Sequence, residues 1–315
     1  MNDQIIARAV EVLRRGGLVS FPTETVYGLG ADALNARAVE RIFEVKGRPG
    51  TNPLIVHVAD AATARRYAEA WPVEATWLAE RFWPGPLTLI LPKQHSIPDV
   101  VTAGRPTVGL RVPRHPVALE LLKAFDGPVA APSANRSTRV SPTSAQHVRD
   151  ELGDAVDLIL DGGACDVGIE STVLDLSVET PTILRPGSIT REEIEREIGP
   201  VAVFGGSVAA GVVASSPGQH AVHYAPRARA YRFAAEQRDQ MRSAALRDRN
   251  PSHVYLFLGE MPGTPEQYAR ELYRTLRSHD EQGASAMFIE MPPDTAEWAA
   301  VRDRLTRATV PAPDL

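Results

Sequence analysis

The sequence predicts an α/β protein, with a mixed β-sheet in a large N-terminal domain and a small α/β domain near the C-terminus. Short apolar runs bounded by Gly, Pro and Asp recur between residues 18 and 184, with helical patterns between several of them. Such runs are typical of strands, and their irregular alternation with helices favours a mixed sheet over a doubly wound parallel one. A stretch rich in small residues then separates the two domains.

The large domain is expected to begin with an amphipathic helix, because Ile6, Val10 and Leu13 share one helical face ahead of Gly16. Asn35 is placed to cap a second helix. The strands predicted in this domain are Leu18–Phe21, Pro53–Val58, Leu87–Leu91, Val108–Val112, Val129–Ala131, Leu158–Leu160, Thr172–Leu176 and Thr182–Leu184.

The domain boundaries follow from the change in composition. Residues 1–200 are predicted to form the large domain, residues 201–229 a linker, and residues 230–315 the small domain. A linker of about thirty residues exceeds usual connections, and loops that long are usually functional or disordered. The elements predicted in the small domain are strands at Val254–Leu258 and Ala286–Glu290, a helix opened by Thr264 and Pro265, and a helix at Ala296–Arg307.

Composition excludes several classes of protein. The chain has 315 residues, 43% of them hydrophobic, and a single cysteine, Cys165, so disulfides within the chain and Cys-rich zinc sites are not expected. We expect no signal peptide and no membrane span, because no run of about 18 apolar residues occurs, and a cytoplasmic location fits. The formal net charge of −5 disfavours broad neutralisation of a phosphate backbone, although it allows a local basic pocket.

Common catalytic motifs are absent or out of context. Gly28, Gly30 and Ala33 match a dinucleotide fingerprint, but Thr23–Tyr27 separates them from the preceding strand, so we do not expect a dinucleotide there. The sequence contains no P-loop, no H-E-x-x-H and no G-x-S-x-G pattern. These absences disfavour P-loop nucleotide hydrolases, zinc proteases and hydrolases with a nucleophile elbow.

Two polar loops are candidates for binding phosphates. Lys46 and Arg48 stand in a Gly/Pro loop after a helix, where an ammonium and a guanidinium would suit a polyphosphate. Pro132–Ser137 follows a strand and offers hydroxyl and amide groups at its carboxyl end. The alternative for the first loop is a solvated basic turn, and for the second a polar turn.

Three polar features lie at or within apolar strands. Thr23–Tyr27 follows a strand and could hold a small polar ligand. His57 lies within a predicted strand, where a satisfied core histidine is the alternative. Arg111 lies in another apolar run, and a buried guanidinium needs an anion. That anion could be a ligand carboxylate or an internal Asp or Glu, and both stay open here.

Together these motifs resemble a known family. SFPTETVYGLG, KGRPxxNPLxxH, WPGPLTL, VGLRVP, APSAN, IESTVLD and LRPG occur in this order between residues 20 and 187. They closely resemble the YrdC-like threonylcarbamoyl-AMP synthase family, over roughly residues 3–201. Residues 216–226, which include His223 and Tyr224, resemble the linker of its longer, two-domain members.

The resemblance implies a mixed twisted sheet around a wide, positively lined cavity, plus a small C-terminal α/β Rossmann-like domain. It also implies residue roles. The positions that match those holding L-threonine are Thr25, His57, Arg111, the backbone at Ala131, and Ser171. The positions that match those holding ATP are Lys46, Arg48, Asn52, Thr107, Ser133, Asn135, Ser141, Arg185, and His223 or Tyr224.

The implied reaction joins L-threonine, bicarbonate or CO2, and ATP into L-threonylcarbamoyladenylate and pyrophosphate, which makes the protein a nucleotidyltransferase of tRNA processing. Lys46 and Arg48 would act electrostatically, and Mg²⁺ would be bound by the phosphates rather than by protein side chains. The long linker would serve as a lid over labile intermediates. The product would pass to a tRNA threonylcarbamoyl-transferase complex, and a weak RNA contact is conceivable.

Two alternatives to this function remain at the level of the sequence. The first is another carbamoyl-adenylate-forming enzyme, as in hydrogenase-maturation proteins with a similar domain, although a single cysteine excludes their zinc-finger segments. The second is an RNA-binding module without catalysis, which the net charge of −5 disfavours.

Overall fold

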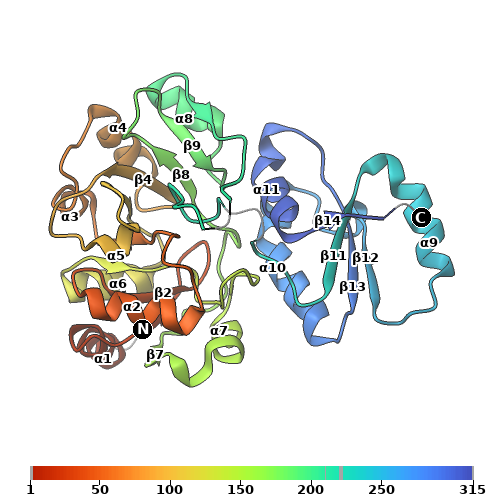
Figure 1. Ribbon diagram of the computed structural model, residues 1–315, viewed down its shortest axis with the longest axis horizontal. Helices are drawn as coiled ribbons and strands as arrows, with labels where there is room; N and C mark the ends of the chain where they lie inside the picture. Colours follow the sequence, from red (N-terminus) through yellow and green to blue (C-terminus); the bar gives the residue numbers. More distant parts are fainter. Residues whose placement is uncertain (1–2, 210, 220–222, 314–315) are drawn as a thin grey trace. The chain divides into compact units, whose positions relative to one another are not determined.

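The computed structural model describes residues 3–209, 211–219 and 223–313 (Figure 1). These residues form two compact units. The first unit comprises residues 3–137, 141–209 and 211–219, and the second comprises residues 138–140 and 223–313. The segment predicted as a linker is therefore divided, because residues 202–219 belong to the first unit.

The first unit is built on a ten-stranded mixed sheet, in the order β10-β9-β8-β4-β5-β3-β6-β2-β1-β7. Neighbours β3 and β5, and β4 and β8, run parallel, whereas β4 and β5, and β1 and β2, run antiparallel. The predicted mixed α/β sheet is thus confirmed. The strands are β1 (Val19–Phe21), β2 (Gly28–Asp32), β3 (Ile55–His57), β4 (Leu87–Pro92), β5 (Thr107–Arg111), β6 (Val129–Ala130), β7 (Leu158–Ile159), β8 (Thr172–Asp175), β9 (Thr182–Arg185) and β10 (Ala202–Val203).

Two of these strands, β2 and β10, were not predicted. In β2 the two glycines serve close packing of the sheet, because a Cβ at Gly30 would lie 2.7 Å from Phe21 Cε1. Gly28 pairs with Phe21 on β1. The glycines that match a dinucleotide fingerprint therefore belong to an antiparallel strand. This strand was missed because two of its five residues are glycines, so it has no apolar run.

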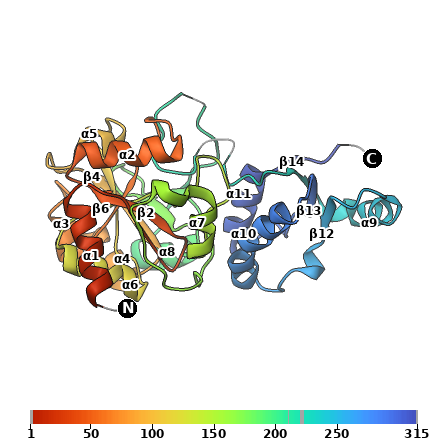
Figure 2. The ribbon, with the colours of Figure 1, turned by 90° about the horizontal axis from the view of Figure 1, so that it is seen from below.

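Helices cover the sheet on both sides. Near β1 and β2, the helix pair α2 and α5 lies on the side of the strands opposite α1 and α6 (Figure 2). Asn35 caps α2 as predicted, since its side chain accepts a hydrogen bond from Ala38 N. No helix in the described part of the chain is long and apolar enough to cross a membrane. The helices of this unit are α1 (Asp3–Arg14), α2 (Ala36–Lys46), α3 (Ala61–Arg65), α4 (Val73–Phe82), α5 (Asp99–Thr102), α6 (Pro116–Phe125), α7 (Ala145–Leu152) and α8 (Arg191–Ile198).

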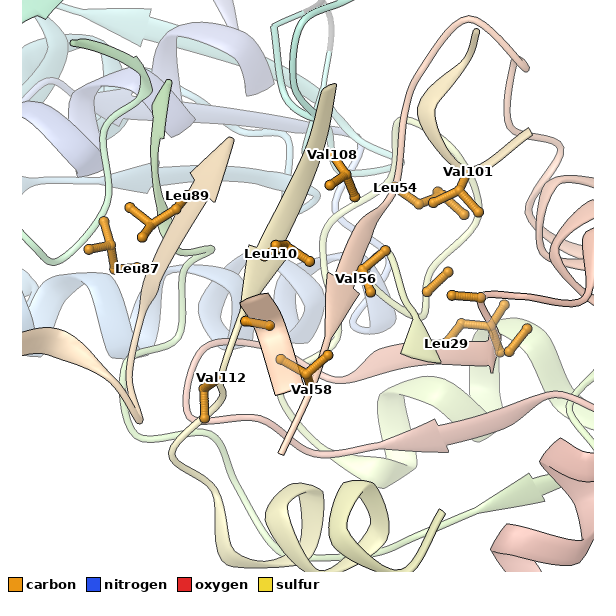
Figure 3. Close-up of a cluster of buried hydrophobic side chains, with 14 of the residues drawn as sticks. Leu29, Leu54, Val56, Val58, Leu87, Leu89, Val101, Val108, Leu110 and Val112 are labelled. Carbon is orange, nitrogen blue, oxygen red and sulfur yellow. The ribbon is translucent and has the colours of Figure 1, made fainter. Parts of the chain in front are cut away.

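The central strands present one apolar face to the main core. Alternate residues of this face, among them Val56, Leu89 and Leu110, form one buried cluster (Figure 3). Because successive strand residues point to opposite faces, the intervening residues face the other side of the sheet. Those residues include His57 and Arg111, so the alternation of the strands already separates the core from the polar face.

The second unit has a four-stranded parallel sheet in the order β12-β13-β11-β14. Helices α10 and α11 lie on one side of it and α9 on the other (Figures 1 and 2). Thr264 caps α10 with Pro265 in its first turn, as predicted, whereas β11, β14 and α9 were not predicted. The elements are β11 (Arg229–Phe233), α9 (Arg238–Arg247), β12 (His253–Leu256), α10 (Pro265–Glu281), β13 (Ala286–Glu290), α11 (Ala299–Ala308) and β14 (Val310–Pro311).

Candidate active site

The polar face of β3, β4 and β5 is covered by a segment from later in the chain. Ser215 and Pro217 lie over this face and, together with Thr88, Thr107 and neighbouring residues, enclose a small cavity. Part of the space expected as a wide cavity is thus filled by the protein's own segment. A separate cavity of about 300 Å³ lies against α3 and α4, and none of the predicted site residues lines it.

Arg111 is at the centre of the first group of site residues. Its Nη2 donates to Glu24 Oε1 at 2.7 Å and to Thr25 Oγ1 at 3.0 Å, and its Nε donates to the Gly85 carbonyl at 3.3 Å. The second carboxylate oxygen of Glu24 accepts from Arg114 N at 2.9 Å. Predicted residues Thr25 and Arg111 are therefore brought together, through a loop and a strand far apart in the sequence.

The internal anion for Arg111 is Glu24, whose carboxylate is 1% exposed. Burial alone would raise the pKa of Glu24, but the charge and hydrogen bond of Arg111, with backbone hydrogen bonds, lower it below its usual value. Among the described residues, Arg111 Nη1 has no hydrogen-bond partner. The internal-partner alternative is therefore correct for Nη2, while Nη1 keeps two donors for a ligand.

His57 lies beside this ion pair. It is directly opposite Arg111 in the parallel register of β3 and β5, and its ring stands edge-on to Phe21 at 6.0 Å. Burial and the charge of Arg111 lower the pKa of His57 to about 3, so the ring is neutral near pH 7. Its Nδ1 is buried and has no hydrogen-bond partner in the described part of the chain. A neutral ring with an open acceptor suits a donor from a bound ligand better than a satisfied core role.

The neutral His57 predicts a specific loss of stability in acid. Its pKa is about 3 in the folded state against an ordinary value of 6.5, so below pH 6.5 the unfolded chain binds a proton at this ring that the folded chain does not bind. Stability should fall as the pH falls from 6.5 towards 3, by about 2 kcal/mol at pH 5 from this group. Urea unfolding of His57→Gln between pH 7 and 4 should show a shallower loss than the natural chain. The exposed-site control His95→Gln should keep the natural slope, and an unchanged slope in His57→Gln would contradict this expectation.

Local helix-end geometry places Lys46 and Arg48. Helix α2 ends at Lys46, and Gly47 follows in the left-handed conformation with φ 59°. The Gly47 and Arg48 N–H groups both donate back to the Phe43 carbonyl, which closes the helix end. A residue with a Cβ would be strained at Gly47. The glycine therefore allows the chain to turn between Lys46, at the end of α2, and Arg48, in the loop that follows.

Lys46 and Arg48 hold neighbouring loops in place. Lys46 Nζ donates to the carbonyl of Ser133 at 2.6 Å and also to the carbonyl of Asn135. Arg48 Nε and Nη2 donate to the carbonyls of Asn52 and Pro53 at 3.1 and 2.9 Å. Lys46, Arg48, Ser133, Asn135 and Asn52 therefore form one contiguous group, as the resemblance implied for the nucleotide side.

Two features of this group favour an anionic ligand. Burial and the charge of Arg48 lower the pKa of Lys46 well below its usual value, and a polyphosphate nearby would favour its charged form. Thr51 Oγ1 is buried without a hydrogen-bond partner in the described residues, and its hydroxyl can donate to a phosphate oxygen. Buried polar atoms without partners are rare in proteins, and a ligand would explain them.

Ser171 and Arg185, which were predicted for different substrates, are in direct contact. Arg185 donates from Nη2 to Ser171 Oγ at 3.1 Å and from Nε to the Ser171 carbonyl at 3.0 Å. Gly187 allows this approach, because a Cβ there would lie 2.3 Å from the Thr172 nitrogen. A residue predicted for threonine thus contacts a residue predicted for ATP.

Three buried polar residues of this region were not predicted as site residues. Thr88 Oγ1 lies 2.8 Å from Ser171 Oγ, and Glu170 accepts a hydrogen bond from Ser141 at 2.5 Å. Glu24 and Glu170 are buried carboxylates within recognised motifs. The signal available in the sequence was a charged residue within an apolar run, because a buried charge needs a partner. It identified Arg111 but not Glu24, which pairs with it.

The segment from 202 to 219 is attached to this site by backbone contacts. Ala214 N donates to the Thr51 carbonyl at 3.1 Å, and Arg185 Nη1 donates to the Pro217 carbonyl at 3.4 Å. Gln219 closes the turn by accepting from the backbone of Ser215 at 2.8 Å and of its neighbour. The segment therefore rests on both the phosphate-side loop and Arg185.

His223 and Tyr224 belong to the second unit. Tyr224 is buried and stacks on Tyr273 at 5.8 Å, with Arg304 over its ring at 5.2 Å. The His223 ring packs on Tyr224 at 4.0 Å. The structure thus places both rings among residues of α10 and α11.

The two remaining predicted residues occupy ordered positions. Thr107 is the first residue of β5 and lines the small cavity. Ala131 follows β6 and its N–H donates to the Ile55 carbonyl at 2.9 Å, so that N–H is used within the sheet. Within the described ranges, no group of three or more His, Cys, Asp and Glu side chains is arranged to hold a metal ion.

Comparisons with known proteins show the family of the chain. The family model described as Telomere recombination, of the Sua5, YciO and YrdC proteins, matches residues 11–187. The model for the C-terminal domain of threonylcarbamoyl-AMP synthase matches residues 189–310. Together the two models span nearly the whole chain.

Full-length relatives and a solved structure extend the match. The chain is 42% identical to the threonylcarbamoyl-AMP synthase of Pyrococcus abyssi, over 96% of this chain and 93% of the relative. It is also 42% identical to that of Bacillus subtilis, over 98% and 93%. The crystal structure of P. abyssi Sua5 complexed with L-threonine matches with a TM-score of 0.91 at 40% identity, covering 98% of this chain and 95% of that one. The chain therefore belongs to the threonylcarbamoyl-AMP synthase family.

Proposed function

We propose that this protein converts L-threonine, bicarbonate and ATP into L-threonylcarbamoyladenylate and pyrophosphate, the first step of threonylcarbamoyladenosine formation in tRNA. The observation that carries the proposal is the contact of Arg185 with Ser171. This contact brings a residue expected to hold the amino acid against a residue expected to hold ATP. One site can therefore hold an amino acid beside a polyphosphate.

On the amino-acid side, Arg111 Nη1 would bind the α-carboxylate of threonine. Thr25, Ser171 and the backbone at Ala131 would contact the remaining polar groups of the amino acid. The neutral His57 would accept a hydrogen bond at Nδ1, which has no partner in the described residues. A neutral acceptor suits a hydroxyl or amine donor of the substrate, because a protonated ring could only donate.

On the nucleotide side, ATP would be bound by Lys46, Arg48, Asn52, Thr107, Ser133, Asn135, Ser141 and Arg185. Threonine's amine adds to CO2 or bicarbonate to give a carbamate. A carbamate oxygen then attacks the α-phosphorus, and the bond to the β-phosphate breaks to release pyrophosphate. Positioning and charge stabilisation by Lys46 and Arg48 would supply most of the rate, because phosphoryl transfer needs no protein nucleophile.

Magnesium would enter with ATP. ATP supplies phosphate oxygens of the kind Mg²⁺ prefers, so the ion would be held mainly by the phosphates. The bound ion would neutralise phosphate charge. Either His223 or Tyr224 would contact the nucleotide, and the product would pass to a tRNA threonylcarbamoyl-transferase complex.

A pyrophosphate-release assay with the full chain tests the proposed function. Release should require L-threonine, bicarbonate and ATP together, and omission of any one should abolish it. The adenylate product should be detected by mass spectrometry in the same reactions. Release of pyrophosphate without threonine, or no release with all three substrates, would overturn the proposal.

Serine should be a poorer substrate than threonine. The two differ by one methyl group, and the loss of a methyl contact in a closed pocket costs about 1–3 kcal/mol of transition-state binding, or about 10- to 200-fold in kcat/KM. Pyrophosphate release measured over a range of each amino acid gives this ratio. Equal kcat/KM values for serine and threonine would contradict a pocket fitted to the threonine side chain.

A further inference from the structure

Glu24 carries a carboxylate that the proposed reaction does not itself use, in the middle of the amino-acid side of the site. It is 1% exposed, and its backbone carbonyl accepts from Val167 N at 2.8 Å. The loop around it is closed by Thr23, whose Oγ1 donates to the Val26 carbonyl at 2.6 Å. The backbone at Glu24 is therefore held by contacts that do not involve Arg111.

The hydrogen bonds of the pair determine which edge of the guanidinium faces a ligand. Both Nη2 hydrogens of Arg111 are used, by Glu24 at 2.7 Å and Thr25 at 3.0 Å, and Nε is used by Gly85 at 3.3 Å. In the described part of the chain, only Nη1 retains both of its donors. Glu24 and Gly85 thus hold the guanidinium from two directions and leave one nitrogen for an anion.

A free, buried arginine would be costly before substrate arrives, and its long side chain would occupy several rotamers. An internal carboxylate removes both problems, because it supplies the opposite charge and fixes the orientation in advance. Its second oxygen accepts from Arg114 N at 2.9 Å, which ties the end of β5 to the same anchor. Sites whose ligand-binding groups are held by supporting hydrogen bonds bind with less reorganisation.

We propose that Glu24 is a positioning residue that fixes Arg111 so that its Nη1 faces the α-carboxylate of the amino-acid substrate. This inference rests on the proposed function, since it takes an amino acid as the ligand of Arg111. Glu24 acts through Arg111 and is not itself a catalytic residue. Its effect is therefore confined to ligands that carry a carboxylate.

Calorimetric binding of L-threonine to the full-length protein tests this inference. Glu24→Ala and Glu24→Gln should weaken threonine binding by about 10- to 100-fold, the scale for a misplaced binding group, and leave ATP binding within about two-fold. Glu24→Gln keeps the shape of the side chain and one acceptor oxygen. It therefore still tests the role of the carboxylate if Glu24→Ala does not fold. A double variant, Glu24→Gln with Arg111→Ala, should bind threonine no more weakly than Arg111→Ala alone, because the two residues act as one unit.

A ligand without a carboxylate separates positioning from general support of the fold. L-Threoninol should bind the Glu24→Gln variant and the natural protein equally weakly. Asp157→Asn is the matched control, since Asp157 also accepts from an arginine, Arg41 at 3.1 Å, and from a backbone N–H, Leu18 at 2.7 Å. It should leave threonine binding unchanged.

The outcomes distinguish this inference from the proposed function. Natural threonine binding in Glu24→Gln, or additive losses in the double variant, would overturn the positioning role even if the natural protein makes the adenylate. Weakened threonine binding in Glu24→Gln together with no pyrophosphate release by the natural protein would overturn the proposed reaction and leave the positioning role intact. No threonine binding by the natural protein would overturn both.

Discussion

The variants Lys46→Ala and Arg48→Ala should each form the adenylate about 100-fold or more slowly than the natural chain. This is the scale for losing one preorganised contact to the charge that develops in the transition state. Both side chains flank the Gly47 turn at the end of α2 and are buried, Lys46 against the carbonyls of Ser133 and Asn135 and Arg48 against that of Asn52. Single-turnover pyrophosphate release at saturating ATP measures the effect on the chemical step.

Stability must be measured alongside, because both side chains also hold loops. Lys46 donates to the carbonyl of Ser133, and Arg48 to those of Asn52 and Pro53. Arg48→Lys keeps a charge but loses the planar two-nitrogen contact, so its rate should lie between those of alanine and the natural chain. The exposed Arg65→Ala is the control for a lost cation. Near-natural rates in Lys46→Ala and Arg48→Ala, with folded protein, would show that the two cations only shape a surface turn.

Removing the segment that covers the site should have a comparable effect. A chain that ends at Val201 lacks Ala214 and Pro217, which bond to Thr51 and Arg185. We expect at least about a 100-fold loss of product, because Arg185 loses a support and because the carbamate and the mixed anhydride are exposed to water. Product yield by mass spectrometry, rather than ATP consumption alone, is the appropriate measurement.

A point change in the full chain isolates the contribution of the segment from that of the second unit. Ala214 is fully buried, so Ala214→Arg cannot pack against Thr51 and should lift the segment from the site. The exposed Val212→Arg, two residues away, is the matched control and should keep natural yield. Natural product yield in both Ala214→Arg and the shortened chain would mean that residues 202–219 are only a connection.

Much of the fold was predictable because local patterns agree with it. Short apolar runs identified eight of the ten strands of the first sheet, and capping residues Asn35 and Thr264 identified two helix starts. The missed strand β2 contains two glycines, and β11 follows directly on the small-residue stretch. Their strand character comes from pairing with neighbours rather than from their own side chains.

The sequence by itself determined the family, the order of the motifs and the residue types suited to an amino acid and a polyphosphate, because these are properties of short segments. Only the tertiary structure decided that Glu24 is the internal partner of Arg111, that Ser171 meets Arg185, that residues 202–219 cover the first unit, and that Tyr224 packs within the second. The first two of these contacts join residues that are 87 and 14 positions apart in the sequence. The sequence shows that a buried charge needs a partner of opposite charge. Which of several residues is that partner depends on how the fold brings distant loops together.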